Sequence, residues 1–73
     1  MLILKKLNGN VSYENIYNTC KRKGHTNTKA DEITKTILAY LDYSAFETSN
    51  VVCCDTRTVF RRIKEFLKDD EIY

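Results

Sequence analysis

The sequence of 73 residues contains no proline and no tryptophan, only two glycines and a single histidine. The apolar run at its N-terminus, residues 1–4, is far shorter than the roughly 18–20 residues that a membrane span requires. The same opening lacks the basic start and the small-residue cleavage site of a secretory signal. We therefore expect no membrane association and a cytoplasmic protein, located at the host nucleoid if the source is prokaryotic.

Sequence signals of catalysis are also missing. The chain has one histidine, no glycine-rich phosphate loop and no Ser/His/Asp set in a known order. A chain this short buries only about 60% of the surface that its unfolded form exposes, which leaves little material for a deep pocket. We predict that the protein is not an enzyme, that it has no small-molecule substrate and that it needs no cofactor.

Cysteine is present in a number that does not suit a secreted disulfide framework, since Cys20, Cys53 and Cys54 make an odd set. A zinc site is the alternative, because four residues separate Cys20 from His25. However, Cys53 and Cys54 are adjacent, whereas structural zinc sites usually space their cysteines as C-x₂₋₄-C. The pattern favours reduced thiols and no metal site.

Charge is distributed unevenly along the chain, although the net charge is only +2. Residues 1–30 carry six Lys and Arg against Glu14 alone, whereas residues 31–73 carry six against nine acidic residues. The basic residues form two clusters: Lys21, Arg22, Lys23 and Lys29 in the first half, and Arg57, Arg61, Arg62 and Lys64 in the second. Clusters of this kind indicate a nucleic-acid-binding surface when folding places them on one face.

Residues 1–24 are expected to form a strand followed by a helix. Residues 1–7 predict a short strand that ends at the turn Asn8-Gly9-Asn10. Ser12 can cap a helix that Gly24 terminates, with apolar positions at helical spacing: Tyr13, Ile16, Tyr17 and Cys20. A hairpin is the alternative, because Asn-Gly is a strong hairpin signal and residues 11–13 alternate in polarity.

Residues 28–73 are expected to contain two further helices. Thr28 can cap the first, whose apolar stripe is Ile33, Ile37, Leu38 and Leu41 and which fades near residues 42–44. Residues 46–55 fit either a buried strand or a short helix. Asp55 can cap the last helix, residues 56–68, with a buried stripe of Val59, Ile63, Phe66 and Leu67. Residues 71–73 can form a terminal strand.

Residues 48–73 read T-S-N-V-V-C-C-D-T-R-T-V-F-R-R-I-K-E-F-L-K-D-D-E-I-Y. In this segment Ser49 is a small residue, Val52 and Cys54 flank a turn, and Asp55 is the helix cap. A T-V-x-R run follows, formed by Thr58-Val59 and Arg61, and the next apolar positions are Ile63 and Phe66. The segment, with residues 33–41 as a supporting helix, resembles the helix-turn-helix core of winged-helix transcription regulators.

The resemblance implies a mainly α fold with a short β element, as one DNA-binding domain over residues 1–73. Ile72 falls where the wing strand begins. Two departures from the family pattern are visible, since Cys53 stands at the usual turn glycine and Asp70 at the glycine before the wing. The chain also stops at Tyr73, so a truncated or absent wing is expected.

The distribution of charge on the last helix also indicates binding to DNA. With Val59 and Ile63 turned inward, its opposite face carries cations that suit the major groove of double-stranded DNA. The predicted DNA-binding residues are Thr56, Arg57, Thr58, Phe60, Arg61, Arg62 and Lys64. The first three are placed to meet base edges or phosphate, Arg62 and Lys64 to hold phosphates, and Phe60 to touch a thymine methyl or a second subunit. We predict a sequence-specific transcriptional regulator that works as a homodimer.

Two other functions fit parts of the sequence. A strand over residues 1–7 followed by helices resembles a ribbon-helix-helix repressor, in which Ile3, Lys5 and Lys6 would read the major groove from a dimer. Five tyrosines and three phenylalanines also suit a small protein–protein interaction module. The content of Asn, Ile, Lys and Tyr suggests an AT-rich genome, and such a short chain suits a virus, a plasmid or another mobile element.

Overall fold

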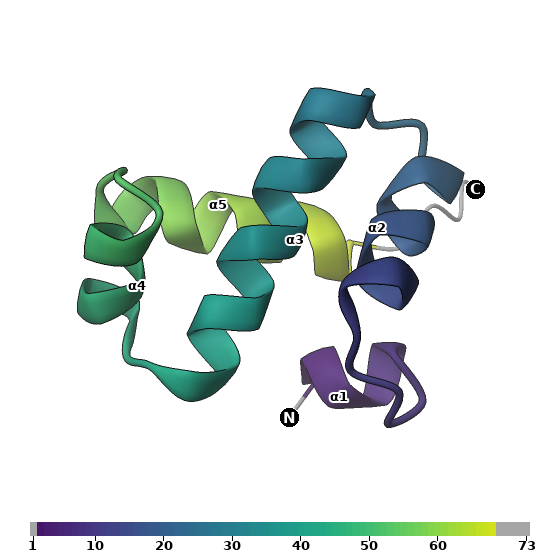
Figure 1. The fold of residues 1–73 in the computed structure, drawn as a ribbon, viewed down its shortest axis with the longest axis horizontal. Coiled ribbons are helices and arrows are strands. Elements are labelled where there is room, and N and C mark those ends of the chain that lie inside the picture. The colour runs from purple at the N-terminus through teal and green to yellow at the C-terminus, as the bar shows by residue number, and fades with distance from the viewer. Residues whose placement is uncertain (1, 69–73) are drawn as a thin grey trace.

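The structure, a computed structural model, describes residues 2–68 and is mainly helical, with no strand in that range (Figure 1). The helices are α1 (Leu2–Lys6), α2 (Tyr13–Arg22), α3 (Asn27–Asp42), α4 (Ala45–Val51) and α5 (Thr56–Leu67). The predicted helical class is confirmed, whereas the short β element is not seen in the described part of the chain. The predicted terminal strand at residues 71–73, with Ile72, lies outside the described residues.

The N-terminal segment is a helix, so the predicted strand over residues 1–7 is wrong. Ile3 and Leu7 are both buried in the core, and Lys5 between them is exposed. A spacing of four places Ile3 and Leu7 on the same face of a helix, whereas a strand would have turned Lys5 inward with them. The hairpin alternative also fails, because Asn8 and Gly9, with φ of 55° and 77°, follow the end of α1 instead of joining two strands.

Helix α2 begins and ends as the sequence predicts. The Ser12 hydroxyl accepts a hydrogen bond from the Asn15 N–H at 3.1 Å. At the other end, Gly24 has φ of 96° and His25 N–H donates to the Cys20 carbonyl at 3.2 Å. This pattern of a left-handed glycine with a long-range N–H bond is the Schellman motif, which satisfies the last carbonyls of the helix.

Helix α3 begins two residues earlier than predicted. Thr26, and not Thr28, is the N-cap, because its hydroxyl accepts from the Lys29 N–H at 3.2 Å. Its pairing with α2 includes a hydrogen bond from the Tyr13 hydroxyl to the Asp31 carboxylate, which raises the pKa of Tyr13 to about 12. Both threonines can cap a helix, so the sequence alone did not separate them.

Residues 46–55, which fit either a strand or a short helix by sequence, contain most of the short helix α4. It starts with a capping box, in which Ser44 and Glu47 exchange hydrogen bonds of 3.1 Å between side chains and backbone N–H groups. The Ser-x-x-Glu spacing is visible in the sequence and was the signal for this helix. The remaining residues of the segment, 52–55, form the connection to α5.

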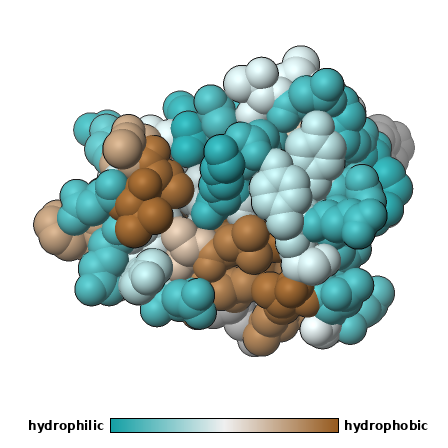
Figure 2. Space-filling model, in the orientation of Figure 1, coloured by the Kyte–Doolittle hydropathy of each residue, from teal (hydrophilic) through white to brown (hydrophobic). Residues whose placement is uncertain are grey.

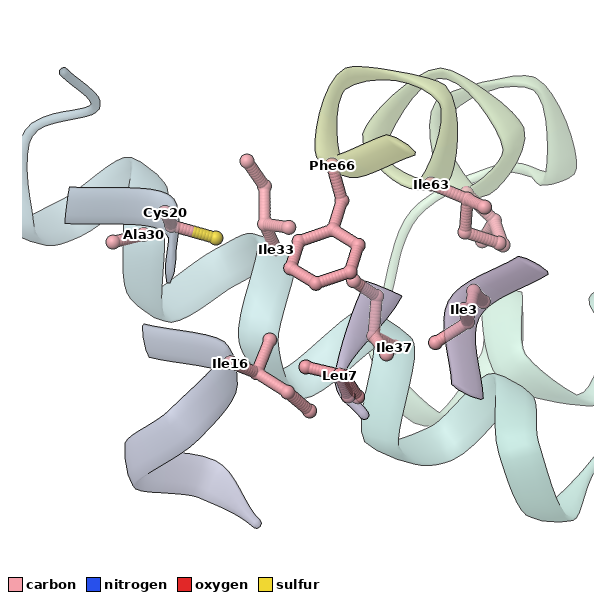
Figure 3. Packing of buried hydrophobic residues seen from close by; sticks show 10 residues of the cluster. Ile3, Leu7, Ile16, Cys20, Ala30, Ile33, Ile37, Ile63 and Phe66 are labelled. Atoms are coloured by element: carbon pink, nitrogen blue, oxygen red, sulfur yellow. The ribbon is translucent and has the colours of Figure 1, made fainter. Parts of the chain in front are cut away.

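One hydrophobic core joins the helices. Helix α3 packs against α2, α4 and α5, and it crosses in front of α5 in the view of Figure 1, while α1 packs on α5. Figure 3 shows the interior, where the Phe66 ring lies among isoleucine side chains from several elements. The buried hydrophobic residues are Ile3, Leu7, Ile16, Cys20, Ala30, Ile33, Ile37, Val59, Ile63 and Phe66. The predicted stripes are confirmed in part, because Tyr13 is 42% exposed and Tyr17, Leu38, Leu41 and Leu67 are half-buried, whereas the other predicted residues are in the core. The side of α5 that faces away from α3 is exposed.

Candidate nucleic-acid interface

The connection between α4 and α5 is a tight four-residue turn. Within it Cys53 has φ of 57°, the left-handed conformation that glycine adopts most readily. The N–H of Cys54 donates to the carbonyl of Ser49 at 3.0 Å, and Ser49 itself is buried with its hydroxyl bonded to the Phe46 carbonyl at 2.6 Å. A small residue therefore lies against the turn, and the turn keeps a glycine-type conformation although its residue is cysteine.

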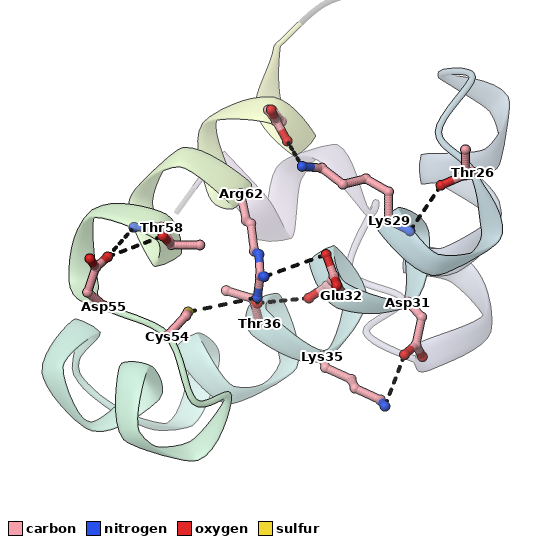
Figure 4. Close-up of polar contacts among 11 residues, drawn as sticks. Thr26, Lys29, Asp31, Glu32, Lys35, Thr36, Cys54, Asp55, Thr58 and Arg62 are labelled. Atoms are coloured by element: carbon pink, nitrogen blue, oxygen red, sulfur yellow. Dashed lines mark hydrogen bonds and ion pairs between the residues drawn. The ribbon is translucent and has the colours of Figure 1, made fainter.

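The first turn of α5 is fixed by Asp55. Its carboxylate accepts from the backbone N–H of Thr58 at 3.1 Å and from the Thr58 hydroxyl at 3.2 Å (Figure 4). The bond from the Thr58 N–H lowers the pKa of Asp55, with smaller contributions from Arg57 and Arg61. The predicted cap is therefore confirmed. Because the Thr58 hydroxyl donates to the Asp55 carboxylate, the Thr58 side chain has a structural role at the start of α5.

The exposed side of α5 carries a line of cations, which we call the cationic stripe: Arg57, Arg61, Lys64 and Lys68. At 3.6 residues per turn these four positions fall within an arc of about 60°, and they extend over about 16 Å of the helix axis. All four residues are exposed. Lys68, the C-cap of α5, was missing from the predicted site, although its spacing of four from Lys64 is visible in the sequence.

Arg62 is not part of the cationic stripe, although the sequence placed it among the phosphate contacts. Its side chain, only 14% exposed, points from α5 toward α3 (Figure 4). It pairs with the Glu32 carboxylate at 3.5 Å and donates to the Thr36 hydroxyl at 3.2 Å and the Cys54 sulfur at 3.8 Å. The arc between Arg62 and buried Val59 is about 60°, so the helical spacing already put Arg62 at the edge of the inner face.

The remaining predicted residues divide between the two faces of α5. Thr56, at the first position, is half-buried. Phe60 is 52% exposed and lies beside the cationic stripe, with its ring against that of Tyr40 from α3. The ring centroids are 6.4 Å apart and the planes meet at 73°, an edge-to-face contact of the kind that aromatic pairs prefer.

The first basic cluster lies at the opposite end of α5 from the turn. Lys23 donates to the backbone carbonyl of Lys68, and Lys29 pairs with Glu65 at 3.5 Å. Lys21 bonds to the Asn27 side chain at 2.7 Å. Folding therefore brings Lys23 and Lys29 of the first cluster to the C-terminal end of α5, where they contact the Lys68 carbonyl and Glu65.

Two patches of hydrophobic side chains lie on the face that α3 crosses. Figure 2 shows one patch over the turn after α4 and another between the C-terminal half of α3 and α1. Val51 is 59% exposed, and with Leu38 and Val52 it lines a groove that also contains charged residues of α3. Exposed apolar side chains beside a groove are compatible with contact to another protein.

The three cysteines are free thiols, with Cys20 buried, Cys54 half-buried and Cys53 exposed. Among residues 2–68, no three side chains of His, Cys, Asp or Glu are grouped as metal ligands would be. In the same range no helix is both long enough and apolar enough to cross a bilayer. No protein-family model, curated protein or solved structure matches this chain.

Proposed function

We propose that the protein binds double-stranded DNA as a small transcriptional regulator, with α5 in the major groove. The observation that carries this proposal is the cationic stripe, which is exposed over the length of α5 while the opposite side of the helix is anchored in the core. A B-DNA major groove is about 12 Å wide and accepts one helix. The connection of α4 to α5 also supports it, since two helices joined by a four-residue turn match the order and turn length of a helix-turn-helix.

The roles of the residues follow from their positions along α5. Arg57 and Arg61 lie nearer its N-terminus, where the recognition helices of such motifs contact base edges. An arginine there can bond a guanine through O6 and N7. Lys64 and Lys68, farther along, suit phosphates, which hold the protein in register without reading sequence. Arg62 is left out of the proposed contact surface, because it is engaged with α3.

The ribbon-helix-helix alternative is not proposed again. It required a strand over residues 1–7 with Ile3, Lys5 and Lys6 exposed as readers, whereas this segment forms α1 and Ile3 is in the core. A protein–protein interaction module stays the second candidate, because Phe46 and Val51 are exposed by 68% and 59%. A homodimer would use the same kind of apolar surface and would match a palindromic operator.

Fluorescence anisotropy with a random-sequence duplex, measured over a range of salt concentrations, tests the proposal. Lys64→Gln/Lys68→Gln should weaken binding and reduce the slope of log K against log [salt] by about two, one unit for each lost phosphate contact. Lys5→Gln/Lys35→Gln is the matched control, since it removes two exposed cations from α1 and α3. Its slope should stay near that of the unmodified protein.

Two results would contradict the proposal. One is the absence of salt-dependent binding by the folded, unmodified protein. The other is an equal loss in both double variants, which would indicate general charge attraction and not a contact through α5. If the first result were obtained, capture of a protein partner that persists at high salt would favour the second candidate.

A further inference from the structure

Phe60 is an unusual residue for the position it occupies. It is a large apolar side chain, half exposed, beside the cationic stripe. On one flank its helical neighbours are Arg57 at i−3 and Lys64 at i+4, which are both exposed, and on the other flank they are half-buried Thr56 at i−4 and buried Ile63 at i+3. The ring therefore lies at the edge of the cationic stripe, next to whatever the stripe binds.

The ring is also held in place. Tyr40 packs edge-to-face against it from α3, at 6.4 Å between centroids. A side chain with few free rotamers loses little entropy when it is covered by a ligand. Phe60 therefore presents a preformed apolar surface beside two cations, Arg57 and Lys64, a combination that an anionic ligand with an apolar group would match.

A second copy of this chain is a poor match for that surface. In a two-fold dimer the same patch faces itself, so the arginines of one subunit would approach those of the other. Like charges brought together in this way oppose association. A duplex instead supplies phosphates for the cations, and its major groove contains one apolar group on a base edge, the 5-methyl group of thymine.

We propose that Phe60 reads thymine through its 5-methyl group, which makes it a specificity-determining residue of the proposed DNA contact. The inference rests on the proposed function of α5. A phenyl ring cannot replace the water that it displaces from the amino and carbonyl groups of other bases, so it selects against them. A thymine methyl has no such hydration to lose, and covering it is favourable.

The test uses two alternating duplex polymers, poly(dA-dT) and poly(dA-dU), which differ only in the 5-methyl group of each pyrimidine. The unmodified protein should bind the uracil polymer about four-fold more weakly for each methyl group that Phe60 contacts, the effect of removing one buried methyl from the contact. Phe60→Ala should bring the affinity ratio of the two polymers close to one. Phe60→Gln, whose helix propensity is no lower than that of phenylalanine, should do the same.

Phe46→Ala is the matched control, because Phe46 is an exposed phenylalanine on the neighbouring helix α4. It should leave the affinity ratio unchanged. Equal affinity of the unmodified protein for the two polymers, or a ratio that persists in Phe60→Ala and Phe60→Gln, would overturn the thymine inference and leave DNA binding itself standing. Failure to bind either polymer in a salt-dependent manner would instead overturn the proposed function, and the inference with it.

Discussion

Replacing Arg62 by methionine tests whether this arginine holds the fold together or contacts DNA. Methionine keeps most of the aliphatic stem and removes the guanidinium, which in the structure joins α5 to Glu32 and Thr36 of α3 and to Cys54 in the turn. The substitution therefore removes the polar link between three elements without opening a large cavity.

The size of the effect follows from burial. A hydrogen bond from a charged donor to a buried hydroxyl contributes about 1.5–3 kcal/mol, and an ion pair to a half-exposed carboxylate adds less than about 1 kcal/mol. Glu32 is 45% exposed and can be hydrated when the pair is lost, and Thr36 keeps its bond to the Glu32 carbonyl at 2.8 Å. Desolvation of Arg62, whose Nε has no hydrogen-bond partner, offsets part of the gain. We expect a net loss of about 1–2 kcal/mol.

Thermal unfolding followed by circular dichroism measures this loss. For a domain of this size 1 kcal/mol corresponds to about 4–8 °C, so Arg62→Met should melt roughly 5–15 °C below the unmodified protein. Arg57→Met, the exposed counterpart on the same helix, should change stability by less than about 0.5 kcal/mol. The proposed affinity for DNA should fall in Arg57→Met and not in Arg62→Met. Unchanged melting of Arg62→Met with a reduced affinity for DNA would refute the reasoning, since it would indicate that Arg62 contacts DNA and not α3.

Four further predictions come from single sites. Cys53→Gly should raise the free energy of unfolding by about 0.5–1 kcal/mol in urea titrations, because glycine adopts the left-handed φ of this turn without strain. Asp55, whose pKa is lowered by the Thr58 N–H, stabilises the fold above its unfolded pKa of about 3.9 and loses this effect as pH falls through the lower folded value. Thermal melts between about pH 5 and 2 should therefore show a weaker acid dependence in Asp55→Asn. Burial raises the pKa of the Cys20 thiol, so the neutral thiol stabilises the fold fully below its unfolded pKa of about 8.5, and this stabilisation is lost as pH rises through the higher folded value. The melting temperature of Cys20→Ala should therefore decline less at alkaline pH than that of the unmodified protein. Ultraviolet titration should find one of the five tyrosines ionising near pH 12, and Asp31→Asn should return that tyrosine, Tyr13, to the ordinary range.

Features that depend on neighbours in sequence were predictable. Ser12, Gly24 and Asp55 mark helix ends because a cap acts on N–H or carbonyl groups only a few residues away. The inner face of α5 followed from the spacing of Val59 and Ile63, and the exposure of Arg57, Arg61 and Lys64 followed from the same spacing.

Features that depend on distant contacts were not. A five-residue helix such as α1 has little stability of its own, so it forms because the rest of the core accepts Ile3 and Leu7. Likewise, the ion pair of Arg62 with Glu32 could not be predicted from neighbouring residues, because Glu32 lies thirty residues earlier and meets Arg62 only when α3 packs on α5. Phe60 and Tyr40 meet for the same reason. These are the parts of the candidate site where tertiary packing, and not local propensity, decides which side chains are available.

The packing of α1 on α5 has a consequence during synthesis. Ile3 and Leu7 are made about sixty residues before Leu67, the end of the helix that completes their burial. At roughly 5–20 residues per second, synthesis of the segment between them takes about 3–12 seconds. Until α5 is available, Ile3 and Leu7 lack their packing partner in the core. Docking of α1 on α5 is then a late step of folding, and a chain truncated before α5 should remain sensitive to protease.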